Sequence, residues 1–212
     1  MRIDEQLPTY DATSIQHTVI DADPARVYVV TLEADFVEAA RHSSAIRTLF
    51  AMRAAPAGIA RRLRRRPAPP SPGPMRLLDM PADGEWVRLD EDFGREIVFG
   101  AIGRFWGREI RWLRSEAADF SSFQEPGYGK IAANFSLRPY GDGRTVLSYE
   151  ARTQATDPCS RRRFLRYWRL VSPFVGVVMR AMLAYVKAEA ERPYTAETPP
   201  PSRAGPRAEE SS

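Results

Sequence analysis

The chain has 212 residues, which fits one folded domain with a tail better than two domains. Hydrophobic residues make up 43% and charged residues 27%, so a wholly disordered chain is excluded and a packed core is possible. Cys159 is the single cysteine, which excludes an intrachain disulfide and a zinc site of several thiolates. Because the histidines are only His17 and His42, we expect no metal site and no cofactor.

The net charge of +4 is concentrated in one short run. Arg61 to Arg66 contains five arginines and the tail from Pro193 has one net negative charge, so the rest of the chain is neutral. A nucleic-acid-binding domain shows its basic excess across a folded face, and we therefore expect no specific nucleic-acid partner. The run is typical of a solvated loop. Weak contact with an anionic membrane or nucleic-acid surface is the alternative.

Prolines gather in two stretches, which divide the chain. Residues 54–74 are predicted to form a Pro/Arg-rich loop, either a flap over a site or a disordered segment. Residues 193–212 are predicted to form a disordered tail, leaving a folded domain over residues 1–192. The sequence has no window of about 18 uncharged apolar residues, and its N-terminus lacks the apolar core of a signal peptide. We therefore expect a soluble, cytoplasmic protein.

The first elements are predicted from alternation and caps. Residues 14–21 alternate and are rich in β-branched side chains, which indicates a strand. Asp23 and Pro24 then form a helix start, with a helix expected to about Asp35. A second short helix is expected over residues 43–52, where apolar residues recur at helical spacing.

The middle of the chain has the pattern of short strands separated by turns. Strands are expected over residues 75–80, 85–91, 95–102 and 109–114. A short helix or loop containing Phe120 and Phe123 follows. The turn Gly141–Gly143 then joins residues 128–140 to residues 144–156 in a hairpin.

Pairing Tyr140 with Arg144 fixes the register of that hairpin. The apolar face then pairs Leu137 with Leu147, Phe135 with Tyr149 and Ala133 with Ala151, and the polar face pairs Asn134 with Glu150 and Ser136 with Ser148. This alternation predicts an antiparallel sheet whose polar face points to solvent. Asn134 and Glu150 are accordingly interpreted as a cross-strand polar contact rather than a site.

The last and longest helix is predicted to begin at Asp157-Pro158. Its apolar residues recur at steps of four and three: Phe164, Trp168, Val171, Val175, Val178, Met182 and Tyr185. This ridge is long enough to lie across a whole sheet. Pro173 lies within the helix and is expected to kink it, because proline lacks an N–H and clashes with the preceding turn.

Three stretches, IDADPARVYVVTLEADF, FGREIVFGAIGRFW and NFSLRPYGDGRTVLSYEARTQATDP, lie in the order of a first strand and helix, a central hairpin and a final hairpin. Together with the last helix, this order over residues 14–190 resembles the START-like (SRPBCC) superfamily of polyketide cyclases/dehydratases and lipid-transfer domains. The resemblance implies an α+β helix-grip fold, in which a curved antiparallel sheet wraps around the C-terminal helix and encloses an apolar cavity.

The resemblance implies binding of a small hydrophobic or amphipathic ligand, such as a lipid or polyketide, in that cavity. A polyketide cyclase/dehydratase-type enzyme is the alternative, and binding of an anionic membrane or nucleic-acid surface through Arg61–Arg66 is a further one. The expected cavity lining is Phe99, Trp106, Trp112, Tyr128, Phe135, Tyr149, Phe164, Trp168, Val175 and Met182. Each of these side chains also fits ordinary core packing.

Few residues suit catalysis. His17 is the one candidate for acid–base work, because it lies in a predicted strand and histidine titrates near neutral pH. His42 has a weaker case. The hydroxyls of Tyr128 and Tyr149 are suited to orienting a ligand carbonyl. Cys159 has no partner base in the sequence pattern, so we do not expect it to act as a nucleophile.

Overall fold

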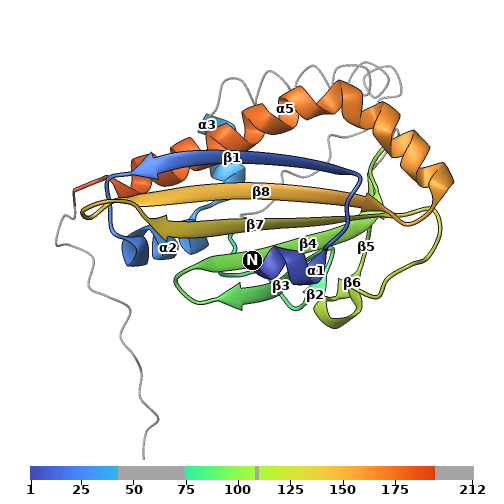
Figure 1. The fold of residues 1–212 in the computed structure, drawn as a ribbon, viewed down its shortest axis with the longest axis horizontal. Coiled ribbons are helices and arrows are strands. Elements are labelled where there is room, and N and C mark those ends of the chain that lie inside the picture. The colour runs from blue at the N-terminus through green and yellow to red at the C-terminus, as the bar shows by residue number, and fades with distance from the viewer. Residues whose placement is uncertain (43–74, 108–109, 194–212) are drawn as a thin grey trace, which may run out of the picture.

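The computed structural model describes residues 1–42, 75–107 and 110–193 (Figure 1). The helix expected over residues 43–52, the loop expected over 54–74 and the tail after residue 193 lie outside the described residues, as does the side chain of His42.

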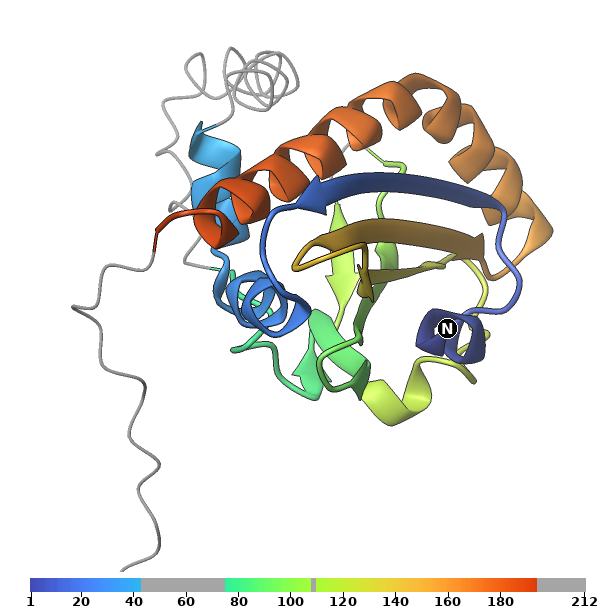
Figure 2. The ribbon, with the colours of Figure 1, turned by 60° about the vertical axis from the view of Figure 1, so that its left-hand side comes forward.

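Six strands form one antiparallel sheet in the order β1–β8–β7–β4–β3, with β5 pairing with the end of β4. They are β1 (Ala12–Ile20), β3 (Trp86–Asp92), β4 (Glu96–Arg104), β5 (Arg111–Leu113), β7 (Gly129–Pro139) and β8 (Thr145–Ala155). A small second sheet pairs β2 (Asp83–Gly84) with β6 (Ser115–Glu116), and the 3-10 helix η1 (Ala117–Asp119) follows it. The main sheet is strongly curved (Figure 2).

The predicted hairpin register is confirmed. Phe135 lies opposite Tyr149, Ala133 opposite Ala151, and the backbone N–H of Tyr140 donates to the carbonyl of Arg144 at 2.9 Å. Both glycines of the turn, Gly141 and Gly143, have positive φ angles, which explains why glycine occupies them.

The strand expected over residues 75–80 is not formed. These residues make a turn instead, and two of their backbone N–H groups bond to residues 32 and 35, at the end of the helix that starts at Pro24, rather than to a neighbouring strand. The N–H of Leu78 donates to the carbonyl of Leu32, and that of Met75 donates to the Asp35 carboxylate. Leu77 is fully buried, so its apolar side chain serves the core without strand pairing.

Both predicted helix starts are confirmed. Asp23 caps α2 (Pro24–Glu33) and Asp157 caps α5 (Pro158–Ala190), each by accepting from two backbone N–H groups of the first turn. Two further helices were not predicted: α1 (Arg2–Gln6) and α3 (Phe36–His42). The turn that precedes α3 is stabilised by Asp35, whose carboxylate accepts from two N–H groups of that helix.

Helix α5 runs beside β1 along the length of the sheet (Figure 1). It continues through Pro173, and its axis bends in its middle part, as the proline predicts. By length and composition it is the one helix within the described ranges that is suited to crossing a membrane. Here it packs on the sheet, with Leu183 and Val186 buried in the main core.

We call the sheet face that packs against α5 the inner face and the opposite face the outer face. The outer face is covered, which contradicts the prediction that it points to solvent. Asn134 is fully buried and Glu150 is 7% exposed, because α1 lies over this face and inserts Ile3 and Leu7. Phe120, in the segment after η1, completes the cover.

A buried carboxylate fixes α1 on the outer face. Glu96 accepts hydrogen bonds from the backbone N–H groups of Arg2 and Ile3, at 2.9 and 3.2 Å, and from the side-chain amide of Asn134 at 2.6 Å. The first N–H groups of a helix have no partner within the helix, so Glu96 supplies the missing acceptor from another strand. Beside it lies an ion-paired set of Asp4, Glu150 and Arg152.

The curved sheet with α5 along its inner face is a helix-grip α+β fold, as the START-like resemblance implies.

Candidate functional site

The inner face has a row of small side chains across its middle. Ser14, Ala151 and Ala133 are consecutive partners on β1, β8 and β7. The neighbouring row toward one end contains the large rings of Tyr149 and Phe135. These alanine and serine side chains project less far from the sheet than the rings of the neighbouring row.

Several apolar residues in the middle of α5 are less buried than those before and after them. Phe164 and Met179 are 1% and 2% exposed, and Gly176 is buried beside Gln16 of β1, yet Trp168, Val171 and Val175 are only half-buried. A helix that packs tightly on a sheet buries its central apolar residues best. Here the two ends are buried and the centre keeps accessible apolar surface.

Aromatic clusters close both ends of this stretch. At one end Phe105 packs edge-on against Phe164, with ring centroids 5.9 Å apart. At the other end the ring of Phe135 is stacked between Tyr149, at 4.3 Å, and Phe36 of α3, at 5.6 Å. The site defined by the small row and the centre of α5 therefore has rigid aromatic ends.

Tyr149 provides a polar atom inside this apolar setting. Burial raises the pKa of its hydroxyl to about 12, so the phenol is neutral and able to donate at physiological pH. The hydroxyl has no hydrogen-bond partner within the described part of the chain, and the residue keeps accessible surface. The Tyr149 hydroxyl therefore has a donor and an acceptor that no described residue uses.

The structure brings most of the predicted lining residues to the inner face. Phe99, Phe135 and Tyr149 form a group of contacting rings in the main core, and Met182 packs beside Tyr149. A second group surrounds the Phe105 end of the site: Trp106, Trp112, Phe164 and Trp168. Val175 lies between the two groups on α5 and belongs to neither.

Two predicted residues lie elsewhere. Tyr128 packs in the outer-face cluster, with its ring edge-on to Phe123 at 5.4 Å and the Arg104 guanidinium 4.4 Å from its centroid. His17 alternates with inward-facing Gln16 on β1, so it lies on the outer side, where it is exposed and contacts the Ser148 hydroxyl at 2.8 Å. Strand alternation accounts for both displacements.

Sequence reasoning missed two contributors to the site. Phe36 was assigned to a connection, although its ring stacks on Phe135. The small row was visible in the hairpin register as the pair Ala133 and Ala151. Whether this row contributes to a site depends on where α5 crosses the sheet, and the sequence of the hairpin does not indicate that position.

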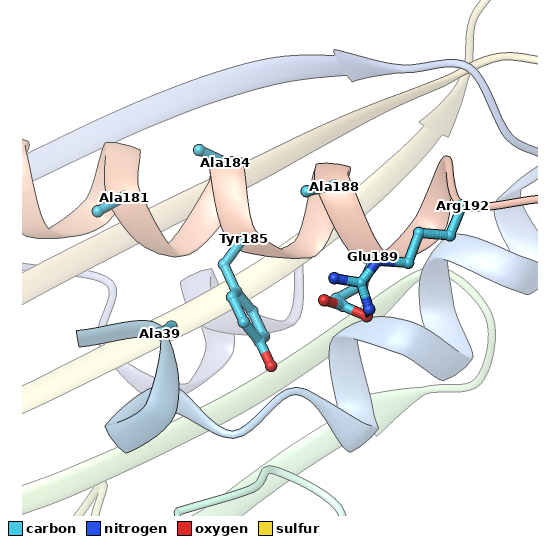
Figure 3. A pocket seen from close by; sticks show the side chains of 7 residues that line it. All are labelled: Ala39, Ala181, Ala184, Tyr185, Ala188, Glu189 and Arg192. Carbon is cyan, nitrogen blue, oxygen red and sulfur yellow. Dashed lines mark ion pairs between the residues drawn. The ribbon is translucent and has the colours of Figure 1, made fainter. Parts of the chain in front are cut away.

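A separate open groove of about 710 Å³ lies between α3 and the C-terminal half of α5 (Figure 3). Its α5 wall carries alanines and Tyr185, which extends toward Ala39, and an ion pair of Glu189 and Arg192 closes one end. None of the predicted lining residues borders it. Another cleft, of about 450 Å³, lies near Met1 at the turns joining β3 to β4 and β7 to β8. Within the described ranges no cluster of His, Cys, Asp and Glu is suited to a metal ion.

No protein-family model and no curated protein matches the chain. Solved structures similar to it include a protein from Chromobacterium violaceum, at 14% identity over 85% of this chain and 98% of the other, with a TM-score of 0.34. A hypothetical protein from Helicobacter pylori matches at 10% identity over 89% and 94%, with a TM-score of 0.35. The Zhui aromatase/cyclase from Streptomyces sp. R1128 matches at 13% identity over 85% and 94%, with a TM-score of 0.28. At these low values the fold class rests on the strand order and on α5.

Proposed function

We propose that the chain binds one small apolar or amphipathic molecule between the small row of the inner face and the middle of α5. The observation that supports this most strongly is the half-buried state of Trp168, Val171 and Val175, which lie between the buried Phe164 and Met179 on α5. Apolar surface left accessible between two packed elements is stabilised when a ligand covers it.

The chemistry of the site favours a ligand that is mostly apolar and has one oxygen or nitrogen at its buried end. Apart from the hydroxyls of Ser14 and Tyr149, the side chains named for the site are aliphatic or aromatic, so a charged group on the ligand would lose hydration without compensation. Tyr149 offers a neutral hydroxyl at the wall, and hydrogen bonding to a carbonyl or hydroxyl of the ligand would give it the missing partner. A fused-ring or acyl compound with one ketone has this character.

The decisive experiment places a larger side chain in the small row of the inner face. Ala151→Leu adds three carbons in the small row, and Ala132→Leu adds the same atoms on the tightly packed outer face, where Ala132 is fully buried. If the inner site is open, Ala151→Leu changes the free energy of unfolding by less than about 1 kcal/mol, whereas overpacking in Ala132→Leu lowers it by about 1–3 kcal/mol. Chemical denaturation followed by tryptophan fluorescence measures both.

Binding is measured in the same variants. The fluorescent probe 1-anilinonaphthalene-8-sulfonate is titrated into the folded protein, and the purified protein is extracted with organic solvent and searched for a bound molecule by mass spectrometry. We expect probe binding to fall at least about tenfold in Ala151→Leu, because the leucine occupies the ligand's volume. Equal destabilisation by both leucines would show that the inner site is already filled, and the proposal would then be wrong.

A further inference from the structure

The side of α5 that faces away from the sheet combines exposed apolar residues with arginines. Leu170 is 73% exposed and Phe174 is 41% exposed, which is unusual for large apolar side chains in a folded domain. Arg163 and Arg166 precede them at steps of three and four, so all four side chains share one face of the helix. We call these four residues the α5 ridge.

The helix is apolar well beyond what the sheet covers. An 18-residue stretch of α5 is apolar enough for a membrane span, yet only 28% of that stretch is buried. The core helix of a water-soluble domain normally buries most of such a stretch. The exposed apolar surface of α5 is therefore not explained by packing within the described residues.

Four arginines of this region have no acidic partner among the described residues. Arg162 and Arg169 flank the α5 ridge and are exposed like Arg163 and Arg166. Within the described ranges none of these four forms an ion pair, whereas the neighbouring Arg161 pairs with Asp11 at 2.5 Å. From its first residue to Ala188, α5 contains no Asp or Glu. Four arginines without an acidic partner in the described part of the chain thus lie on the turns that lead up to the exposed apolar residues.

We propose that the α5 ridge binds the surface of an anionic lipid bilayer, with Leu170 and Phe174 inserted among the acyl chains and the arginines against headgroup phosphates. An apolar strip bordered by guanidinium groups is the pattern that favours interfacial binding, since the apolar atoms leave water and the charges meet phosphates at the same depth. Arginine also forms two-pronged hydrogen bonds to phosphate oxygens.

Charge also decides against a second copy of this chain as the occupant. A two-fold contact through the α5 ridge would place the arginines of one copy near those of the other, with no carboxylate on the ridge to separate them. An anionic bilayer meets every arginine with the opposite charge. The α5 ridge as defined does not include Arg61–Arg66, which lie outside the described residues.

Vesicle flotation of the full chain tests the proposal. Vesicles of phosphatidylcholine alone are compared with vesicles containing about 30% phosphatidylglycerol, at low and high salt. We expect binding to the anionic vesicles only, weakening with salt. Arg163→Gln with Arg166→Gln should weaken it about 25-fold, taking about fivefold for each arginine. Leu170→Gln with Phe174→Gln should weaken it about tenfold or more.

Matched controls separate the α5 ridge from general charge and apolar effects. Arg95→Gln with Arg138→Gln removes two exposed charges near the β3–β4 and β7–β8 turns that have no ion pair among the described residues, and Leu78→Gln with Phe93→Gln removes two exposed apolar residues. Neither control pair should change binding by more than about twofold. Wild-type binding by either ridge variant overturns the proposal, as does loss of binding only when the five arginines of Arg61–Arg66 are replaced. A concentration-dependent dimer that needs Leu170 and Phe174, without vesicle binding, also overturns it.

Discussion

Replacing Glu96 with alanine should release α1 from the outer face and destabilise the whole domain. Glu96 accepts from three donors, two of which, on Ile3 and Asn134, are buried. A hydrogen bond to a charged group contributes about 1.5–3 kcal/mol, and each donor left buried without a partner costs a similar amount. The domain can avoid that cost only by detaching α1, which exposes Ile3 and Leu7 at about 1.5–3 kcal/mol each.

Both routes lead to a similar loss, so we expect Glu96→Ala to lower the free energy of unfolding by about 3–5 kcal/mol. Denaturation with urea measures the loss, and amide hydrogen exchange of residues 1–7 reports whether α1 detaches. Glu96→Gln keeps one acceptor oxygen and should lose less than the alanine variant. The exposed Glu85→Ala is the control, with a change within about 0.5 kcal/mol. A Glu96→Ala protein as stable as this control, with α1 still protected, would refute the reasoning.

Three other variants test α5 and the inner site. The side chain and N–H of Ser160, together with the N–H of Gly127, donate to the Asp157 carboxylate and hold its pKa below the ordinary 3.8. The stabilising effect of Asp157 is therefore present above about pH 4 and is lost in stronger acid. Asp157→Asn should lose less stability than wild type as the pH falls from about 5 to about 2, which circular dichroism measures. Tyr149→Phe should leave stability within about 1 kcal/mol, because its hydroxyl has no partner among the described residues, and should weaken a ketone ligand about fivefold relative to its hydrocarbon analogue in a competition titration. Phe164→Ala should cost about 3–5 kcal/mol in thermal or urea unfolding, since its ring closes one end of the site; a loss below about 1 kcal/mol would show that this end is loosely packed.

The features that the sequence predicted correctly are set by neighbouring residues. The register of the last hairpin follows from its glycine turn, and the starts of α2 and α5 follow from an aspartate directly before a proline. The features that it missed depend on distant partners. Helix α1 has five residues and is too short to be stable alone, and its first N–H groups bond to Glu96, more than ninety residues away in the chain.

The outer face shows why alternation misled the prediction of solvent exposure. Asn134 and Glu150 alternate with apolar residues, as they would on a wetted face. Their polar groups instead meet other polar groups: Asn134 donates to Glu96, and Glu150 accepts from Arg152, which also binds Asp4 of α1. A polar residue in an alternating strand indicates which face it lies on, and only the covering element decides whether water or protein satisfies it.

The same two turns of α5 account for both proposals. Val171 and Val175 are half-buried, while Leu170 and Phe174 are exposed, with Pro173 among them. Few buried contacts hold this part of the helix, and proline removes one of its backbone hydrogen bonds, so it should open locally at a lower free energy than the buried C-terminal turns. A ligand beneath these turns and a bilayer against them would cover the two sides of one weakly held segment. Contact with the bilayer would therefore favour opening where an amphipathic ligand has to enter.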